Sequence, residues 1–97
     1  MSMTEIIRIK EEILKFLKDQ EAGVFLFGSR SRKDHHQGSD IDIGIIPRGP
    51  INKDRLILLR ELLENLNTPY KIEIVDFSTV SEAFQKEALK DAEWWRD

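Results

Sequence analysis

The sequence predicts an α+β fold, that is, a mixed α/β domain in which a small mixed β-sheet is flanked by helices. Three short apolar runs have the composition of strands, and they alternate with segments in which apolar residues recur every three or four positions. The predicted order is helix, strand, short helix, strand, helix, strand, helix. Because 97 residues suit one domain with one core, we expect residues 1–97 to form a single domain.

In the first half of the chain, residues 4–19 have the apolar spacing of an amphipathic helix. Residues 24–27 are an unbroken apolar run between two glycines, which predicts a strand that is buried on both faces. A tight turn and a short helix should follow Gly28. Residues 40–46 form the second predicted strand, and the two prolines in residues 47–50 end it.

In the second half, a leucine stripe predicts a core-facing helix over residues 53–66. Residues 71–76 are the third strand, and the connection between the last two strands has the length of a crossover, although the sequence leaves strand direction open. A last helix is expected over residues 78–91, with Thr79 three residues before Glu82 as in a capping box.

Two tryptophans near the end of the sequence allow two interpretations. Trp94 and Trp95 could form a patch that binds a partner, because tryptophan is enriched at the centres of interfaces. Alternatively, one or both could fold back onto the core. The sequence leaves both interpretations open.

Composition restricts the class of protein. The chain is 40% hydrophobic and 34% charged, as in globular proteins, and no apolar run approaches the length of a membrane span. Charged residues interrupt the N-terminal segment, so it lacks the apolar core of a secretory signal, and we expect a cytoplasmic protein without a membrane partner. A net charge of −3 argues against nonspecific binding to duplex nucleic acid, and the absence of cysteine excludes disulfides and thiolate metal sites.

The turn after the first predicted strand has the features of a phosphate site. Gly28 lets the backbone approach a phosphate because no Cβ intervenes, and Ser29 would begin the next helix. Backbone N–H groups at a helix start, together with a serine hydroxyl, bind anions. Arg30 or Arg32 could add charge-assisted hydrogen bonds.

A pair of carboxylates follows at the start of the second predicted strand. Asp40 and Asp42 are two residues apart, so in a strand they project from the same face, while Ile41 and Ile43 project from the other. Acidic residues in an otherwise apolar strand usually mark function. Beside a phosphate site, such oxygen ligands suit one or two Mg²⁺ ions, and this combination indicates nucleotidyl transfer.

A third carboxylate commonly completes a site with two metal ions. The third predicted strand offers Glu73 and Asp76, which are three residues apart and therefore face opposite sides of a regular strand. We favour Glu73, because it is the polar residue inside the apolar run. Asp76 stands at the strand end, where aspartate often forms a turn or caps a helix, and it is the alternative.

These motifs resemble those of the minimal nucleotidyltransferases in the DNA polymerase beta-like superfamily. The pattern is Gly28-Ser29, ten intervening residues, Asp40-x-Asp42, and then a carboxylate in a hydrophobic strand, here Glu73. The resemblance implies the nucleotidyltransferase fold, with the aspartates holding Mg²⁺ on the triphosphate of ATP or another nucleoside triphosphate. The third family carboxylate is usually aspartate, so glutamate at position 73 departs from the pattern.

The resemblance also implies a biological setting. Many proteins of this kind are antitoxins that neutralise a HEPN-domain ribonuclease toxin, either by binding it or by transferring AMP to one of its tyrosines. Because the sequence ends soon after the predicted core, we expect the acceptor hydroxyl to lie on a partner protein or to be held across a homo-oligomer interface. A second hypothesis is a binding module that keeps the fold without turnover.

Overall fold

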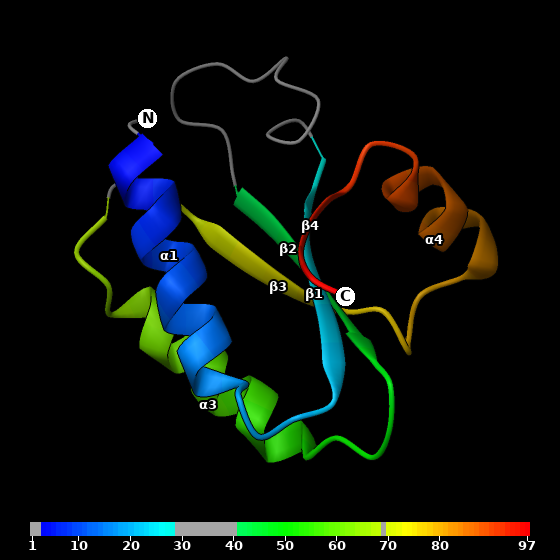
Figure 1. Cartoon of the computed structure of the whole chain (residues 1–97), viewed down its shortest axis with the longest axis horizontal. Helices are drawn as coiled ribbons and strands as arrows, with labels where there is room; N and C mark the ends of the chain where they lie inside the picture. Colours follow the sequence, from blue (N-terminus) through cyan, green and yellow to red (C-terminus); the bar gives the residue numbers. More distant parts are fainter. Residues whose placement is uncertain (1–2, 29–40, 69) are drawn as a thin grey trace.

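The computed structural model describes residues 3–28, 41–68 and 70–97 of the chain. The elements in this part of the chain run in the order α1 (Met3–Phe16), β1 (Ala22–Phe27), β2 (Ile41–Pro47), α3 (Lys53–Glu64), β3 (Ile72–Asp76), α4 (Glu82–Leu89) and β4 (Glu93–Arg96) (Figure 1). The four strands form one sheet in the order β3-β2-β1-β4. The α+β class and the mixed sheet predicted from the sequence are confirmed.

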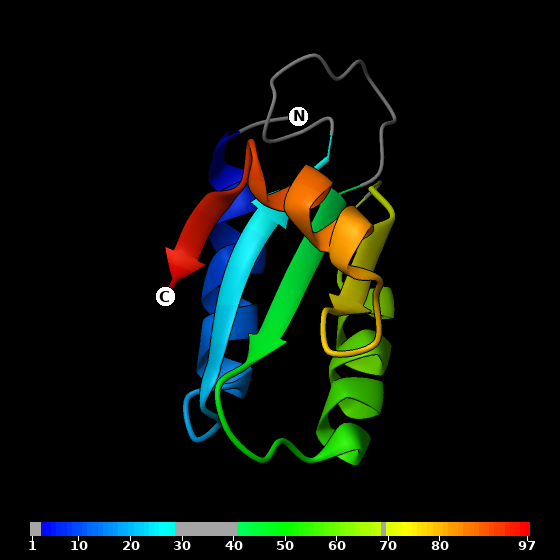
Figure 2. The same ribbon diagram turned by 90° about the vertical axis from the view of Figure 1, so that its right-hand side faces the viewer.

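The sheet separates two layers of helix, because its strands alternate between two apolar faces (Figure 2). One face packs against α1 and α3. In β2 this face presents Ile41, Ile43 and Ile45, all of which are buried. The other face carries an aromatic cluster of Phe25, Phe27 and Phe77, over which α4 lies. The sheet is therefore covered by helices on both faces, as in other mixed folds.

Strand directions, which the sequence left open, follow from the pairing. β1 is antiparallel to both β2 and β4, whereas β2 and β3 are parallel. Helix α3 makes the crossover between β2 and β3, because parallel neighbours begin at the same end of the sheet. Its leucine stripe faces the core, with Leu56, Leu59 and Leu63 buried as the periodicity predicts.

The last part of the chain differs from the prediction in two ways. Helix α4 begins at Glu82, with the Ser81 hydroxyl as its cap, and the predicted capping box at Thr79 is wrong. The hydroxyl of Thr79 instead donates to the carbonyl of Asp76, 2.8 Å away, which holds Thr79 in the turn before the helix. The observed helix is thus shorter at both ends than the predicted helix over residues 78–91.

A fourth strand, which the sequence did not predict, follows α4. In β4, Trp95 packs into the core at 9% exposure, while Trp94 lies on the aromatic face and remains 41% exposed. The Trp94 ring contacts Phe25, with a centroid distance of 4.9 Å, and the guanidinium of Arg48 lies over it. Trp95 therefore folds back onto the core, and Trp94 packs against the aromatic face of the sheet.

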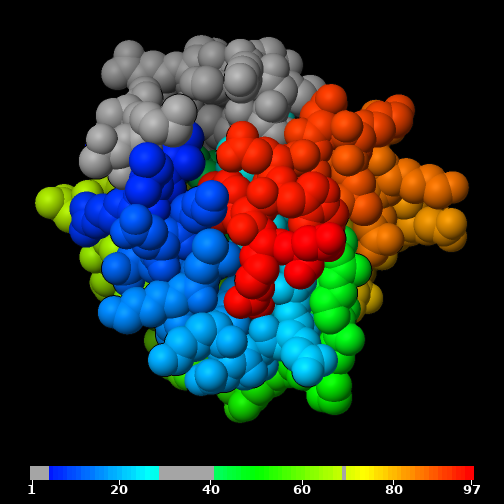
Figure 3. Space-filling model, in the orientation of Figure 1, coloured from blue at the N-terminus to red at the C-terminus, as the bar shows by residue number. Residues whose placement is uncertain are grey.

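Arg96 holds β4 against the connection between α1 and β1. Its guanidinium donates hydrogen bonds to the carbonyls of Leu17, Gln20 and Ala22, at distances of 2.9 to 3.1 Å. Figure 3 shows the resulting arrangement, in which the red C-terminal residues lie against the blue and cyan segments. Within the described residues, no helix combines the length and the apolar character that crossing a membrane requires.

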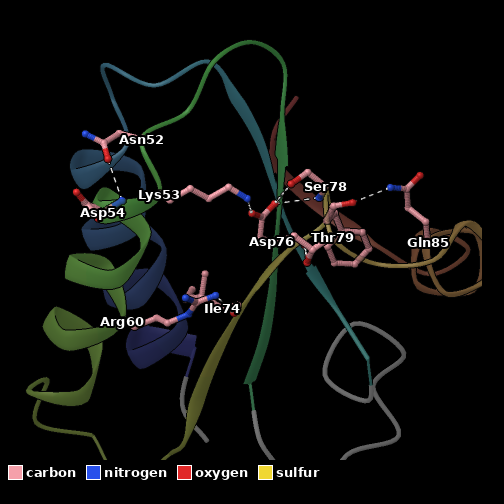
Figure 4. Close-up of polar contacts among 10 residues, drawn as sticks. Asn52, Lys53, Asp54, Arg60, Ile74, Asp76, Ser78, Thr79 and Gln85 are labelled. Carbon is pink, nitrogen blue, oxygen red and sulfur yellow. Dashed lines mark hydrogen bonds and ion pairs between the residues drawn. The ribbon is translucent and has the colours of Figure 1, made fainter.

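Asp76 ties the end of β3 to the start of α3 on the face opposite the aromatic cluster (Figure 4). Its Oδ2 accepts a hydrogen bond of 2.6 Å from Lys53 Nζ, and its Oδ1 accepts from the backbone N–H and the hydroxyl of Ser78. Burial raises the pKa of the Asp76 carboxyl, but these hydrogen bonds and the charge of Lys53 outweigh burial, so the pKa lies below its ordinary value. The carboxylate is a structural anchor.

The absence of a side chain at position 44 gives a first testable prediction. A Cβ on Gly44 would overlap the ring of Phe25, which is fully buried and cannot move aside. We expect Gly44→Ala to lower the free energy of unfolding by about 1–3 kcal/mol, measured by urea denaturation. Gly23→Ala is the matched control, because its Cβ would meet the outer ends of Trp94 and Arg48, which can shift. Equal losses in the two variants would contradict this account.

Asp76 gives a second prediction, on pH dependence. Because its pKa is lower in the folded than in the unfolded chain, its ionised form adds stability above the unfolded pKa, and that stability is lost as pH falls through the folded pKa. Asp76→Asn should lower the free energy of unfolding by about 1–2 kcal/mol near neutral pH. The difference from the wild type should shrink below about pH 4.

Urea titrations at several pH values would measure this difference, with Asp91→Asn at an exposed site as the matched control. A stability difference between wild type and Asp76→Asn that is independent of pH would show that the carboxylate does not act through its charge.

Candidate functional site

One end of the sheet brings together the predicted site residues that the structure describes. β1 ends at Phe27, directly before Gly28, and its antiparallel neighbour β2 begins at the same end of the sheet. Because β3 is parallel to β2, it also begins there. Gly28, Asp42 and Glu73 therefore lie near one another, although up to 45 positions separate them in the sequence.

The register of the parallel pair places two carboxylates side by side. Asp42 of β2 and Glu73 of β3 are direct register partners, so their side chains leave the same face of the sheet. This is the face of the aromatic cluster, since Phe27 is the register partner of Asp42 on the other side. The Glu73 side chain is 45% exposed, and its Oε1 lies 3.4 Å from Lys71 Nζ.

Gly28 lies close to the Asp42 carboxylate, with no room for a side chain between them. Its φ is +79°, in the region that side chains rarely adopt, and a Cβ built there would lie 2.6 Å from Asp42 Oδ2. Two independent constraints, the backbone conformation and the close approach, therefore require glycine at this position. The phosphate-approaching role predicted for Gly28 stays a prediction, but its backbone does lie against the predicted metal ligand.

Asp76 lies on the other side of the sheet and toward the other end of β3. Its register partner is Ile45, which is buried against α1 and α3, and its oxygens are occupied by Lys53 and Ser78. The structure therefore brings Glu73, and not Asp76, to the Asp42 carboxylate. The same arrangement was predicted from the sequence, because residues three apart in a strand face opposite sides of the sheet.

Four predicted site residues, Ser29, Arg30, Arg32 and Asp40, lie outside the described residues. Within residues 3–28, 41–68 and 70–97, no group of three or more carboxylate, histidine or cysteine side chains is close enough to hold a metal ion. The described part of the predicted site thus contains two carboxylates and one glycine. Carboxylate oxygens are the ligands that Mg²⁺ prefers, and Mg²⁺ usually retains water and takes substrate phosphates as further ligands, so this donor set fits the ion.

A small pocket, which the sequence analysis did not identify, adjoins this site. It has a volume of about 180 Å³ and is lined by Phe27, Gly28, Phe84, Glu87 and Ala88, from the end of β1 and from α4. Phe84 and Ala88 are four residues apart and share one face of α4, but nothing in the sequence indicated that this face would meet Gly28. A larger hollow of about 330 Å³ between α1 and α3 contains none of the predicted site residues.

Comparison with known proteins identifies relatives of this chain. A Haemophilus influenzae protein named "Probable protein adenylyltransferase MntA" is 32% identical over 66 residues, which are 65% of this chain and 55% of that protein. The chain thus spans about half the length of this relative.

Two solved structures share the fold. A protein described as a minimal nucleotidyltransferase superposes with a TM-score of 0.76 at 21% identity, covering 96% of this chain and 95% of its own. A complex of a tri-AMPylated Shewanella oneidensis HEPN toxin with an MNT antitoxin contains a chain that superposes with a TM-score of 0.61 at 20% identity, covering 90% of this chain and 68% of its own.

Family membership rests on most of the sequence. Residues 11–94 match the family described as "Polymerase beta, Nucleotidyltransferase", and this range includes both the described and the undescribed parts of the predicted site. The resemblance inferred from the Gly-Ser and Asp-x-Asp motifs is confirmed. The chain belongs to the polymerase beta nucleotidyltransferase family.

Proposed function

We propose that this chain is a Mg²⁺-dependent nucleotidyltransferase that moves AMP from ATP to a hydroxyl group on a partner protein. The observation that carries the proposal is the pairing of Asp42 with Glu73 in register, with the Gly28 backbone against the Asp42 carboxylate. This arrangement provides oxygen ligands beside a backbone that a phosphate can approach. The family of the chain supports the reaction class.

In the proposed reaction, the acceptor oxygen attacks the α-phosphorus of ATP. A bond forms between that oxygen and phosphorus, the bond to the β-phosphate oxygen breaks, pyrophosphate leaves, and the hydroxyl proton passes to solvent. Asp42 and Glu73, together with Asp40, would hold Mg²⁺, and Gly28, Ser29 and either Arg30 or Arg32 would contact the phosphates. When bound, Mg²⁺ supplies positive charge that neutralises the charge developing on the phosphate oxygens.

The chain's own contribution is positioning. Asp42 stands on a strand that pairs on both sides, with β1 and β3, so its backbone is fixed by two ladders. The contact with Gly28 then restricts where its carboxylate can lie. Ligands that are held in place before substrate binds need no rearrangement during the reaction, and this is how a site with little covalent chemistry accelerates phosphoryl transfer.

The proposed acceptor is a HEPN-type toxin. The relative's name describes a protein adenylyltransferase, and one structure with the same fold is a complex of an AMPylated HEPN toxin with an MNT antitoxin. We therefore propose that the chain acts as an antitoxin of this kind in the cytoplasm.

A second candidate function is a binding module that neutralises the same partner without transferring AMP. The observation that favours it is Glu73, which is one methylene longer than the usual family aspartate, is 45% exposed and lies near Lys71. A longer and more exposed carboxylate is fixed less firmly than a short one, so metal geometry would suffer. Protection of the partner would then depend on complex formation alone.

Transfer of α-phosphate-labelled ATP to the HEPN-type partner, with Mg²⁺, tests the proposal directly. We expect the wild type to label the partner and Asp42→Asn to reduce the rate at least about 100-fold, because a lost metal ligand removes several kcal/mol of charge stabilisation. Glu73→Gln should cause a loss of similar size. Far-UV circular dichroism and thermal unfolding would establish that each variant keeps the fold.

Asp91→Asn is the matched control, because it neutralises an exposed aspartate that lies outside the predicted site. It should retain transfer near neutral pH. Full labelling by Asp42→Asn would overturn the metal assignment. A stable complex that protects the partner without any labelling, equally well with wild type and Asp42→Asn, would favour the binding module.

A further inference from the structure

We propose that the pocket between the end of β1 and α4 holds the base of the nucleoside triphosphate. This inference rests on the proposed function, because it assigns the base of the same substrate whose triphosphate lies at Asp42 and Gly28. The pocket is lined by Phe27, Gly28, Phe84, Glu87 and Ala88. Figure 2 shows α4 crossing the sheet near the end at which β1 stops and β2 begins.

Gly28 connects the pocket with the proposed phosphate site. Its backbone lies against the Asp42 carboxylate, and the same residue forms part of the pocket wall. In a nucleotide, a single ribose separates the base from the α-phosphate, so the two sites that bind them must be neighbours. The larger hollow between α1 and α3 lacks this connection, because it includes neither Gly28 nor Asp42.

The walls of the pocket suit a flat aromatic ligand. The rings of Phe27 and Phe84 are nearly perpendicular, at 86°, with their centroids 6.1 Å apart, so a base could lie against the face of one and the edge of the other. Ala88 adds a small apolar surface. The charged lining residue, Glu87, is directed to Lys90, with an oxygen 3.1 Å from its Nζ.

The size of the pocket also fits a base better than a whole nucleotide. Its volume of about 180 Å³ lies below the range of about 300–1,000 Å³ that is typical for sites enclosing complete drug-sized ligands. A base can enter while the ribose and phosphates remain outside, toward Gly28 and Asp42.

Phe84 is packed against the aromatic cluster but is only partly buried by it. Phe25 and Phe77 are almost fully buried within that core, whereas Phe84 is 45% exposed although it contacts both Phe27 and Phe77. Its position at the boundary between core and solvent leaves part of its ring available. Aromatic side chains in such positions can stack with any of the bases, since every base has a π-face.

Calorimetric titration of the wild-type chain and its variants with Mg-ATP, and separately with Mg-tripolyphosphate, tests this assignment. Tripolyphosphate carries the phosphates without the base. Phe84→Ala should weaken ATP binding about tenfold and leave tripolyphosphate binding unchanged. Asp42→Asn should weaken the binding of both ligands, because it acts on the phosphates.

Leu58→Ala is the matched control, since it removes a similarly exposed apolar side chain from α3, on the opposite face of the sheet. It should bind both ligands as the wild type does. If Phe84→Ala unfolds, Phe84→Leu keeps an apolar side chain without the ring and should still weaken ATP binding selectively. Thermal unfolding identifies that case.

Three results would overturn the assignment. Wild-type affinity for ATP in Phe84→Ala, with loss in Asp42→Asn, would reject the base pocket and keep the proposed function. Wild-type affinity for ATP in Phe84→Ala, combined with a raised KM of this variant for the partner protein, would assign the pocket to the acceptor. If the wild type bound neither Mg-ATP nor Mg-tripolyphosphate, the proposed function itself would be rejected, and the pocket assignment with it.

Discussion

Parallel pairing of β2 with β3 requires the chain to return across one face of the sheet, and α3 makes this return. Besides apolar packing, two polar contacts help to hold the helix to β3. Lys53 binds Asp76 near the end of the strand, and Arg60 Nη2 donates a 3.1 Å hydrogen bond to the carbonyl of Ile74 (Figure 4). These hydrogen bonds fix the position of β3 relative to the helix.

The same register that α3 supports sets the position of Glu73. A shift of β3 by one residue would turn Glu73 to the helix face and bring Ile72 or Ile74 to the side of Asp42. The contacts of Lys53 and Arg60 lie away from the proposed site, yet they oppose such a shift. The geometry of the proposed metal ligands thus depends on an anchor on the other face of the sheet.

Two glycines adapt the aromatic face of the sheet to different neighbours. Gly44 leaves room for the Phe25 ring, which packs onto the backbone of β2, and Gly28 leaves room for the Asp42 carboxylate. Phe25 and Phe27 are the register partners of Gly44 and Asp42 respectively. Within a single two-residue repeat of the strands, this face therefore changes from an apolar core to the polar site.

Local periodicity predicted most of this arrangement. The sequence pattern predicted the buried positions of three elements, because side chains in strands repeat every two residues and those in helices every 3.6. These elements are the strands around residues 24–27 and 71–76 and the leucine stripe of α3. The placement of Glu73 and Asp76 on opposite faces of the sheet follows from the same alternation. These features need no knowledge of which segments pair.

Other features depended on contacts between distant segments, which periodicity does not contain. β4 has four residues, Glu93–Arg96, so its pattern is too short to distinguish a strand from a loop. Its pairing with β1 and the packing of Trp95 into the core both depend on contacts with segments distant in the sequence. Likewise, the contact of Gly28 with Asp42 requires the register of β1 and β2, and Asp76 shortened the last helix by drawing Ser78 and Thr79 into a turn.

The two parts of the proposed nucleotide site are supported very differently. Asp42 stands on a strand within the sheet, whereas Phe84 stands on α4, an eight-residue helix that has no fully buried residue. A helix with few buried contacts opens or shifts at lower free-energy cost than a central strand. On the proposed assignment, the phosphates would meet rigid ligands and the base an adjustable wall. Binding should therefore depend more on the triphosphate than on the identity of the base, since stacking tolerates every base while metal and phosphate ligation demands fixed geometry.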